Sequence, residues 1–199
     1  MKRALSAILI MLTLISCSQN RPTRIFHVGV SQCSDDAWRT KMNEEMENEL
    51  IFHPELQLSI RQANDNSQLQ CSQIDSFIAE GVDLLIVSPN EAEEVKPAVS
   101  RAFDAGIPVI VADRQVTGEK YTAFIGGDNY AVGINMANWL AEQANNNNAT
   151  SDKPLQVIEV MGLQGSTPCV WRHKGLLDGL KDVENVRLMG SGNADWFAT

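Results

Sequence analysis

The sequence has few of the features that mark catalytic and cofactor-binding proteins. The loop after the first apolar run lacks the glycines of a dinucleotide site, and "GLQGSTPC" (162–169) lacks the lysine of a phosphate-binding loop. Only three histidines are present, and the pair Cys169 and His173 on one helical face is too small for a metal site. No nucleophile, base and acid form a recognisable catalytic set. We therefore predict no enzyme, no metal and no cofactor.

Basic residues are also scarce. The chain has 16 Lys and Arg against 25 Asp and Glu, a formal net charge of −9. Removal of a leader at residues 1–16 would change the formal net charge from −9 to −11, because that segment contains Lys2 and Arg3 and no acidic residue. Nucleic-acid phosphates attract basic patches, so this balance predicts that nucleic acid is not a partner.

The apolar run at the start of the chain is too short for a membrane span. Residues 1–16, "MKRALSAILIMLTLIS", combine a basic start with an apolar core of about a dozen residues, which predicts a signal peptide. The segment "LISC" (14–17) is similar to a bacterial lipobox, in which the Cys, here Cys17, is lipidated. The alternative is a chance Cys after a plain signal peptide. We expect residues 17–23 to be a tether and the protein to be a membrane-anchored periplasmic lipoprotein of a Gram-negative cell envelope.

Three cysteines remain if Cys17 carries lipid, and an odd number allows at most one intramolecular disulfide. They are Cys33, Cys71 and Cys169. Buried, unreactive thiols are the favoured interpretation.

From residue 24 onward, short apolar β-rich runs alternate with amphipathic helical stretches. The predicted strands are 24–31, 56–63, 82–89, 107–113, 121–126, 155–162 and 186–192, and the predicted helices lie near 36–52, 67–80, 91–105, 128–144 and 168–182. Asn90 is placed to cap the third helix and Gly106 to end it. This alternation predicts an α/β fold with a parallel sheet covered on both faces.

Polar side chains follow three of the predicted strands. Asp35 and Trp38 come after the first strand, Asn90 after the third, and Asp113 and Arg114 after the fourth. Ligands of open parallel sheets bind beyond the carboxyl ends of the strands, so these residues should meet at one edge. A carboxylate beside a guanidinium can accept from and donate to a polyol, and Trp38 offers a face for a sugar ring.

Each of these residues also has a structural interpretation. Trp38 begins an every-fourth-residue apolar pattern and could face the core. Asp35 or Asp36 could serve only as a helix cap, and Asp113 with Arg114 could form a solvated ion pair. These alternatives remain open at the level of the sequence.

Five motifs, in order along the chain, carry a resemblance to a known family. They are "VGVSQCSDDAWRTKM", "GVDLLIVSPNE", "AGIPVIVADRQ", "FIGGDN" and "VMGLQGSTPCVWRHKGLLDGL". Together they resemble the type I periplasmic sugar-binding proteins, the superfamily of ribose-binding protein and the lactose repressor. "SQCSDDAW" and the segment starting "GSTP" are most similar to periplasmic sensor domains of Bacteroides-type hybrid two-component regulators.

The resemblance implies two lobes that close on a monosaccharide or small oligosaccharide, with the first lobe at 24–127 and a second at 128–199. Asp35, Trp38, Asp113 and Arg114 match ligand positions of the family. Asp128 and Asn129 fall at the hinge between the lobes. The position of a further sugar-binding Arg holds Val170, which argues against ribose, and Arg172 is either a ligand donor or a structural residue.

Members of this family continue well beyond the point where this chain reads "ADWFAT" (194–199). We therefore expect a C-terminally truncated chain with an incomplete second lobe. The implied function is non-catalytic sugar binding that signals to a histidine-kinase domain or delivers ligand to an ABC permease. The alternatives are a sugar hydrolase or isomerase that uses its carboxylates, and a non-functional remnant.

Overall fold

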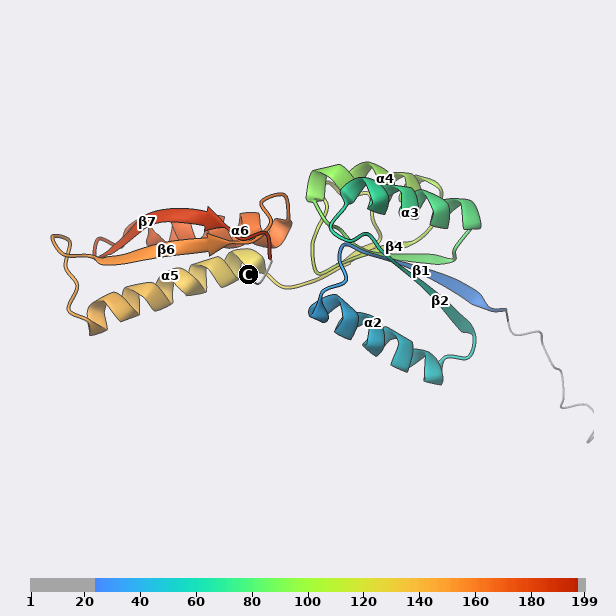
Figure 1. The fold of residues 1–199 in the computed structure, drawn as a ribbon, viewed down its shortest axis with the longest axis horizontal. Helices are drawn as coiled ribbons and strands as arrows, with labels where there is room; N and C mark the ends of the chain where they lie inside the picture. Colours follow the sequence, from blue (N-terminus) through green and yellow to red (C-terminus); the bar gives the residue numbers. More distant parts are fainter. Residues whose placement is uncertain (1–23, 197–199) are drawn as a thin grey trace, which may run out of the picture.

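The computed structural model describes residues 24–196, which form two α/β lobes joined by one crossing of the chain within that range (Figure 1). The predicted signal peptide, Cys17 and the tether lie outside the described residues. In the part of the chain that the structure describes, no helix is both long and apolar enough to cross a membrane.

The first lobe contains five strands and three α-helices. Its elements are β1 (Phe26–Gln32), α2 (Ala37–Glu49) with the 3-10 turn η2 (Leu50–Phe52), β2 (Leu56–Gln62), α3 (Ser67–Glu80), β3 (Leu84–Ser88), α4 (Ala92–Asp104), β4 (Val109–Ala112) and β5 (Ala123–Ile125). The second lobe consists of α5 (Asn129–Asn146), β6 (Leu155–Met161), α6 (Thr167–Leu180) and β7 (Val186–Asn193). The predicted strands and helices are all present, with boundaries shifted by a few residues at most.

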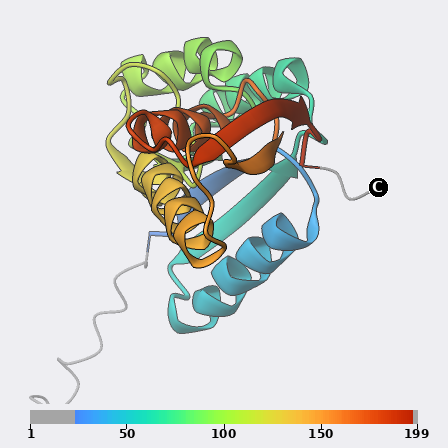
Figure 2. The same ribbon diagram turned by 90° about the vertical axis from the view of Figure 1, so that its left-hand side faces the viewer.

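The first sheet is parallel throughout, in the order β2-β1-β3-β4-β5. Helices α3 and α4 cover one face and α2 lies on the other, as both views show (Figures 1 and 2). Parallel pairing places the carboxyl ends of all five strands at the same edge. The predicted α/β fold class is therefore confirmed.

The main core lies between this sheet and the α3–α4 layer. Phe77 and Ile74 of α3 and Val95 and Val99 of α4 are at most 1% exposed, and they pack with Leu85, Val87, Val109 and Val111 of the central strands. Burying a side chain of this size contributes roughly 1.5–3 kcal/mol. This layer therefore holds rigid the strand ends that carry the polar residues.

One predicted helix cap is wrong. The residue at the N-cap of α4 is Glu91, whose side chain makes no capping hydrogen bond. Asn90 precedes it, is 2% exposed and turns its side chain toward the interior of the lobe. Gly106 does follow the end of the helix as predicted, with a φ of +82° that suits glycine.

The second lobe packs two helices closely because glycines face each other. A Cβ at Gly175 of α6 would lie 2.2 Å from the carbonyl oxygen of Tyr130, and one at Gly133 of α5 would lie 2.2 Å from the carbonyl oxygen of Arg172. Neither position has room for a side chain. The parallel pair β6-β7 forms the sheet of this lobe.

We expect Gly175→Ala to destabilise the second lobe by about 1–3 kcal/mol, since an overpacked contact must push α5 and α6 apart. The usual effect of this change in a helix is the opposite, a gain of about 0.5–1 kcal/mol. Urea unfolding measures the change. Gly190→Ala is the matched control, because a Cβ at Gly190 meets nothing within 4 Å. Equal stability of the two variants would contradict the close packing.

Candidate functional site

The candidate site lies at the carboxyl edge of the first sheet, where the loops after β1, β3 and β4 converge. The loop before α6 of the second lobe reaches this region. The Ala92 N–H donates to the Gly165 carbonyl oxygen at 3.0 Å, and the Gln115 N–H donates to Thr167 Oγ1 at 2.8 Å. The polar edge of the first lobe is thereby brought next to the second lobe.

An ion pair that the sequence analysis missed joins two elements at this edge. Arg39, in the first turn of α2, donates from Nη2 to Asp113 Oδ2 at 2.6 Å. The Arg39 side chain is 2% exposed, whereas that of Asp113 is 35% exposed. The Nε and Nη1 atoms of Arg39 are buried and have no hydrogen-bond partner among the described residues. Buried polar atoms of this kind are usually hydrogen-bonded, so the Arg39 guanidinium is held mainly by its ion pair with Asp113.

Asp113 occupies a left-handed backbone conformation, with a φ of +63°. Asp adopts this region more readily than most residues because its short side chain can bond locally. The turn also sets the direction of the chain after β4, since the Asp113 N–H donates to the Ile125 carbonyl oxygen at 2.8 Å. The backbone therefore directs the carboxylate toward Arg39 and not toward its sequence neighbour Arg114.

Arg114 is 6% exposed and binds the loop after β3. Its Nη1 donates to the Asn90 carbonyl oxygen at 3.0 Å and lies 3.5 Å from Asn90 Oδ1. The interpretation of Asp113 and Arg114 as a solvated ion pair is wrong, since each has a different partner and Arg114 is buried.

Asp36 caps α2, as one of the open alternatives proposed. Its Oδ1 accepts from the Arg39 N–H at 2.9 Å, and its Oδ2 accepts from the Ser34 hydroxyl at 2.6 Å. Burial acts to raise the pKa of Asp36, but these hydrogen bonds and the Arg39 charge outweigh it and lower the pKa. Asp36 is therefore an ionised structural group.

Asp35 and Trp38 stand exposed next to this cap. Trp38 is 63% exposed, so the alternative interpretation, in which it starts a buried apolar stripe, is wrong. The buried residues of α2 are Arg39 and Asn43, a polar pair four residues apart. The buried face of α2 is polar, so apolar periodicity could not reveal it. Asn43 on this face accepts a hydrogen bond at Oδ1 from Gln32 at 2.6 Å.

Asp65, in the loop after β2, is a further carboxylate at this edge. Burial raises its pKa, with Asp36 and Asp35 adding to the effect and Arg114 and Arg39 opposing it. The edge therefore carries four carboxylates around two guanidinium groups. This excess of negative charge favours a neutral ligand over an anionic one.

Arg172 lies in the second lobe and contacts residues of that lobe. Its Nε donates to Asn129 Oδ1 at 2.8 Å, and its guanidinium lies 5.9 Å from the centre of the Trp196 ring. Asp128 is the N-cap of α5 and accepts from the Ala131 N–H at 2.9 Å. The structure thus gives Arg172, Asp128 and Asn129 structural contacts at the start of the second lobe.

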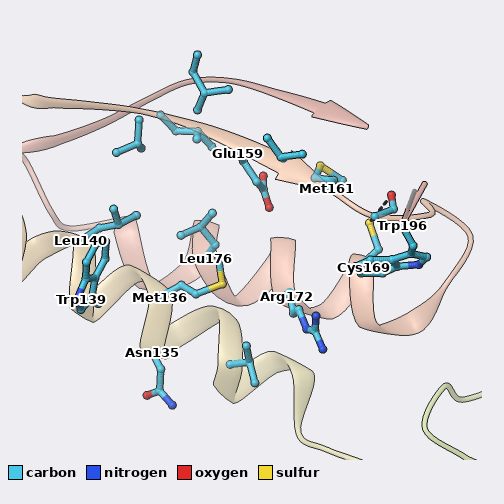
Figure 3. Close-up of a pocket in the computed structure, with 16 residues that line it drawn as sticks. Asn135, Met136, Trp139, Leu140, Glu159, Met161, Cys169, Arg172, Leu176 and Trp196 are labelled. Carbon is cyan, nitrogen blue, oxygen red and sulfur yellow. Dashed lines mark hydrogen bonds between the residues drawn. The ribbon is translucent and has the colours of Figure 1, made fainter. Parts of the chain in front are cut away.

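Arg172 also borders a cavity of about 830 Å³ between α5 and α6 and the strands of the second lobe (Figure 3). Most of its lining is apolar, including Met136, Trp139 and Leu176. Its one carboxylate, on Glu159, is 8% exposed and paired with His173 at 2.7 Å. The cavity lacks the array of hydrogen-bonding groups that a sugar requires, so the polar edge of the first lobe is the better candidate.

The cysteines contribute little to either region. Cys33 and Cys169 are buried free thiols, and Cys71 is a partly buried one. Burial raises the pKa of Cys71 and Cys169, which keeps both thiols protonated and unreactive. Within residues 24–196 no group of three or more His, Cys, Asp or Glu could hold a metal ion.

Comparison with known proteins identifies the same architecture elsewhere. Residues 28–198 match the periplasmic binding protein domain. The fructose-binding periplasmic domain of the hybrid two-component system BT1754 is 40% identical, with a TM-score of 0.80 over 86% of this chain and 55% of that one. A Mycobacterium smegmatis protein in complex with β-D-fucofuranose is 28% identical, with a TM-score of 0.76 over 85% of this chain and 56% of its own.

Among curated proteins, the galactofuranose-binding protein YtfQ of Escherichia coli K12 is 28% identical over 173 residues. The match covers 85% of this chain and 52% of YtfQ. The chain therefore spans about half the length of this relative.

We expect Asp113→Asn to lower the free energy of unfolding by about 1–3 kcal/mol, because it leaves the buried Arg39 charge without a counter-ion. Asn keeps the shape and tolerates the left-handed backbone, so the loss of charge is the main change. Asp35→Asn is the control, with an expected change within about 0.5 kcal/mol, since Asp35 is exposed. Urea denaturation compares them, and equal values would show that the ion pair contributes nothing.

Proposed function

The chain belongs to the periplasmic binding protein family, and on that basis we propose that it binds a neutral sugar, without turnover, at the polar edge between its lobes. The observation that carries this proposal is the polar cluster at this edge, where the partly exposed Asp113 carboxylate is held by Arg39 and the Arg114 guanidinium is held by Asn90 through Nη1. A sugar hydroxyl that bonds a carboxylate or a guanidinium forms a charge-assisted hydrogen bond, which contributes about 1.5–3 kcal/mol.

The neighbouring groups suit a sugar ring. Asp113 is partly exposed and can accept from a hydroxyl, and Arg114 adds a second guanidinium at the same edge. The exposed ring of Trp38 offers an apolar face for the C–H side of a sugar. The proteins compared above are described as binding fructose, fucofuranose and galactofuranose, which supports a furanose as the first class to test.

Binding without catalysis rests on the family, and two of the four carboxylates at the edge are already engaged by protein groups. Asp36 is engaged by Ser34 and the start of α2, and Asp113 is paired with Arg39. Neither is a free acid or base of the kind that sugar hydrolysis requires. The BT1754 domain and YtfQ are described as fructose-binding and galactofuranose-binding.

Ligand would act by favouring a closed arrangement of the lobes over an open one, which a partner then detects. A shift from mostly open to mostly closed requires about 5 kcal/mol of differential affinity. A few charge-assisted hydrogen bonds at about 1.5–3 kcal/mol each supply it. The 40% identity to a hybrid two-component periplasmic domain favours a histidine-kinase partner. Permease and ATPase genes beside this gene would favour transport instead.

We expect heat release in calorimetry, and a change in Trp fluorescence, with one sugar from a panel of D-fructose, methyl galactofuranoside, L-arabinose and D-ribose. Arg114→Met should weaken that binding at least about tenfold, because a charge-assisted hydrogen bond is lost. Arg101→Met is the control, since Arg101 pairs with Asp75 on the exposed surface of α3 and α4. Absence of binding to every sugar of the panel, or turnover of a bound one, would refute the proposal.

We also place the protein in the periplasm, anchored to the membrane by lipid on Cys17. This rests on the family and on the lipobox-like "LISC" segment. Cells fed a labelled fatty acid should label the protein, and Cys17→Ser should abolish the label while Cys71→Ser retains it. Labelling that survives Cys17→Ser would contradict the anchor.

A further inference from the structure

A buried glutamine links the carboxyl ends of two strands behind the candidate site. Gln70 lies in the first turn of α3 and is 0% exposed. Its Nε2 donates to the Ser88 carbonyl oxygen at 2.9 Å and lies 3.4 Å from the Ser31 carbonyl oxygen. Its Oε1 accepts from the Asn90 N–H at 2.8 Å. The amide nitrogen of this side chain therefore binds the ends of β1 and β3, and its oxygen binds the loop after β3.

Asn90 extends the network from Gln70 to Arg114. The Asn90 Nδ2 donates to the Asp65 carbonyl oxygen at 3.1 Å and to Ser67 Oγ at 3.0 Å. These two bonds hold the residue so that its carbonyl oxygen accepts from Arg114 Nη1 at 3.0 Å. The path from α3 to the guanidinium thus consists of buried hydrogen bonds only.

The conformation of Asn90 conflicts with local preference. An Asn just before a helix ordinarily caps it, and a missing cap costs about 0.5–2 kcal/mol. Here the N-cap of α4 is Glu91, without a capping side-chain bond, while Asn90 faces inward. A departure from the local rule that brings no helix stability is typical of a functional site.

The network fits a requirement of the guanidinium group. An arginine side chain has many rotamers, and a ligand that must order it loses affinity in doing so. A guanidinium that is already fixed by a buried acceptor presents its other donors at no such cost. We propose that Gln70 and Asn90 are positioning residues that hold Arg114 in its ligand-binding orientation before the sugar arrives. This inference rests on the proposed function of the same edge.

Two variants of α3 separate a positioning role from a structural one. Gln70→Met keeps the size of the side chain and removes its hydrogen bonds. Gln73→Met is the matched control on the same helix, because Gln73 donates to the Gln62 carbonyl oxygen at 2.9 Å and does not reach Asn90 or Arg114. If Gln70→Met fails to fold, Ser67→Ala replaces it, since it removes only one acceptor of Asn90.

The first measurement needs no ligand. In protein with ¹⁵N-labelled arginine, the guanidinium signals of Arg114 are assigned by their loss in Arg114→Met. We expect separate, slowly exchanging Nη signals in the wild type and in Gln73→Met, and a single averaged signal in Gln70→Met. Averaged signals in the wild type, or unchanged signals in Gln70→Met, would overturn the proposal.

The second measurement is a double-mutant cycle with the sugar that the calorimetric panel identifies, D-fructose being tried first. Gln70→Met should weaken binding about tenfold in the wild type and less than about twofold in the Arg114→Met background. Equal losses in both backgrounds would show a structural role and overturn the proposal. If no sugar binds, the proposed function fails, and the arginine signals alone decide whether Gln70 and Asn90 order Arg114.

Discussion

Parallel pairing of the first sheet is the constraint on which the candidate site depends. Because β1, β3 and β4 run in the same direction, their carboxyl ends lie at one edge, and the residues that follow them are brought together. The close-packed layer of α3 and α4 on one face holds these strand ends rigid. The polar residues are therefore presented by a scaffold that does not have to be ordered by a ligand.

The edge buries two guanidinium groups, an arrangement that is unfavourable unless each finds a partner. Asp113 neutralises Arg39, and the loop after β3 accepts from Arg114. Neither partner uses all the donors of its arginine. These contacts keep both guanidinium groups in place at the edge that we propose as the binding site.

The two lobes differ in how fully their strands are paired and buried. The central strands of the first sheet are paired on both sides. Within residues 24–196, β6 pairs with β7 alone, and its Ile158 and Val160 are more than 70% exposed. An apolar cavity of about 830 Å³ lies between these strands and the helices. The lining of this cavity is mostly apolar, whereas the hydrogen-bonding groups of the proposed site gather in the first lobe.

The sequence by itself determined the elements, their order and the edge at which Asp113, Arg114 and Trp38 gather. Apolar periodicity, glycines and helix caps are local signals that the sequence carries. In a parallel sheet all carboxyl ends lie at the same edge, so the residues that follow the strands must lie there. Tertiary structure alone decided which charges pair. Arg39 and Asp113 are 74 residues apart in the chain, and a left-handed turn at Asp113 selects Arg39 over the adjacent Arg114. The inward turn of Asn90 likewise depends on Gln70, a partner on another element that no local pattern reveals.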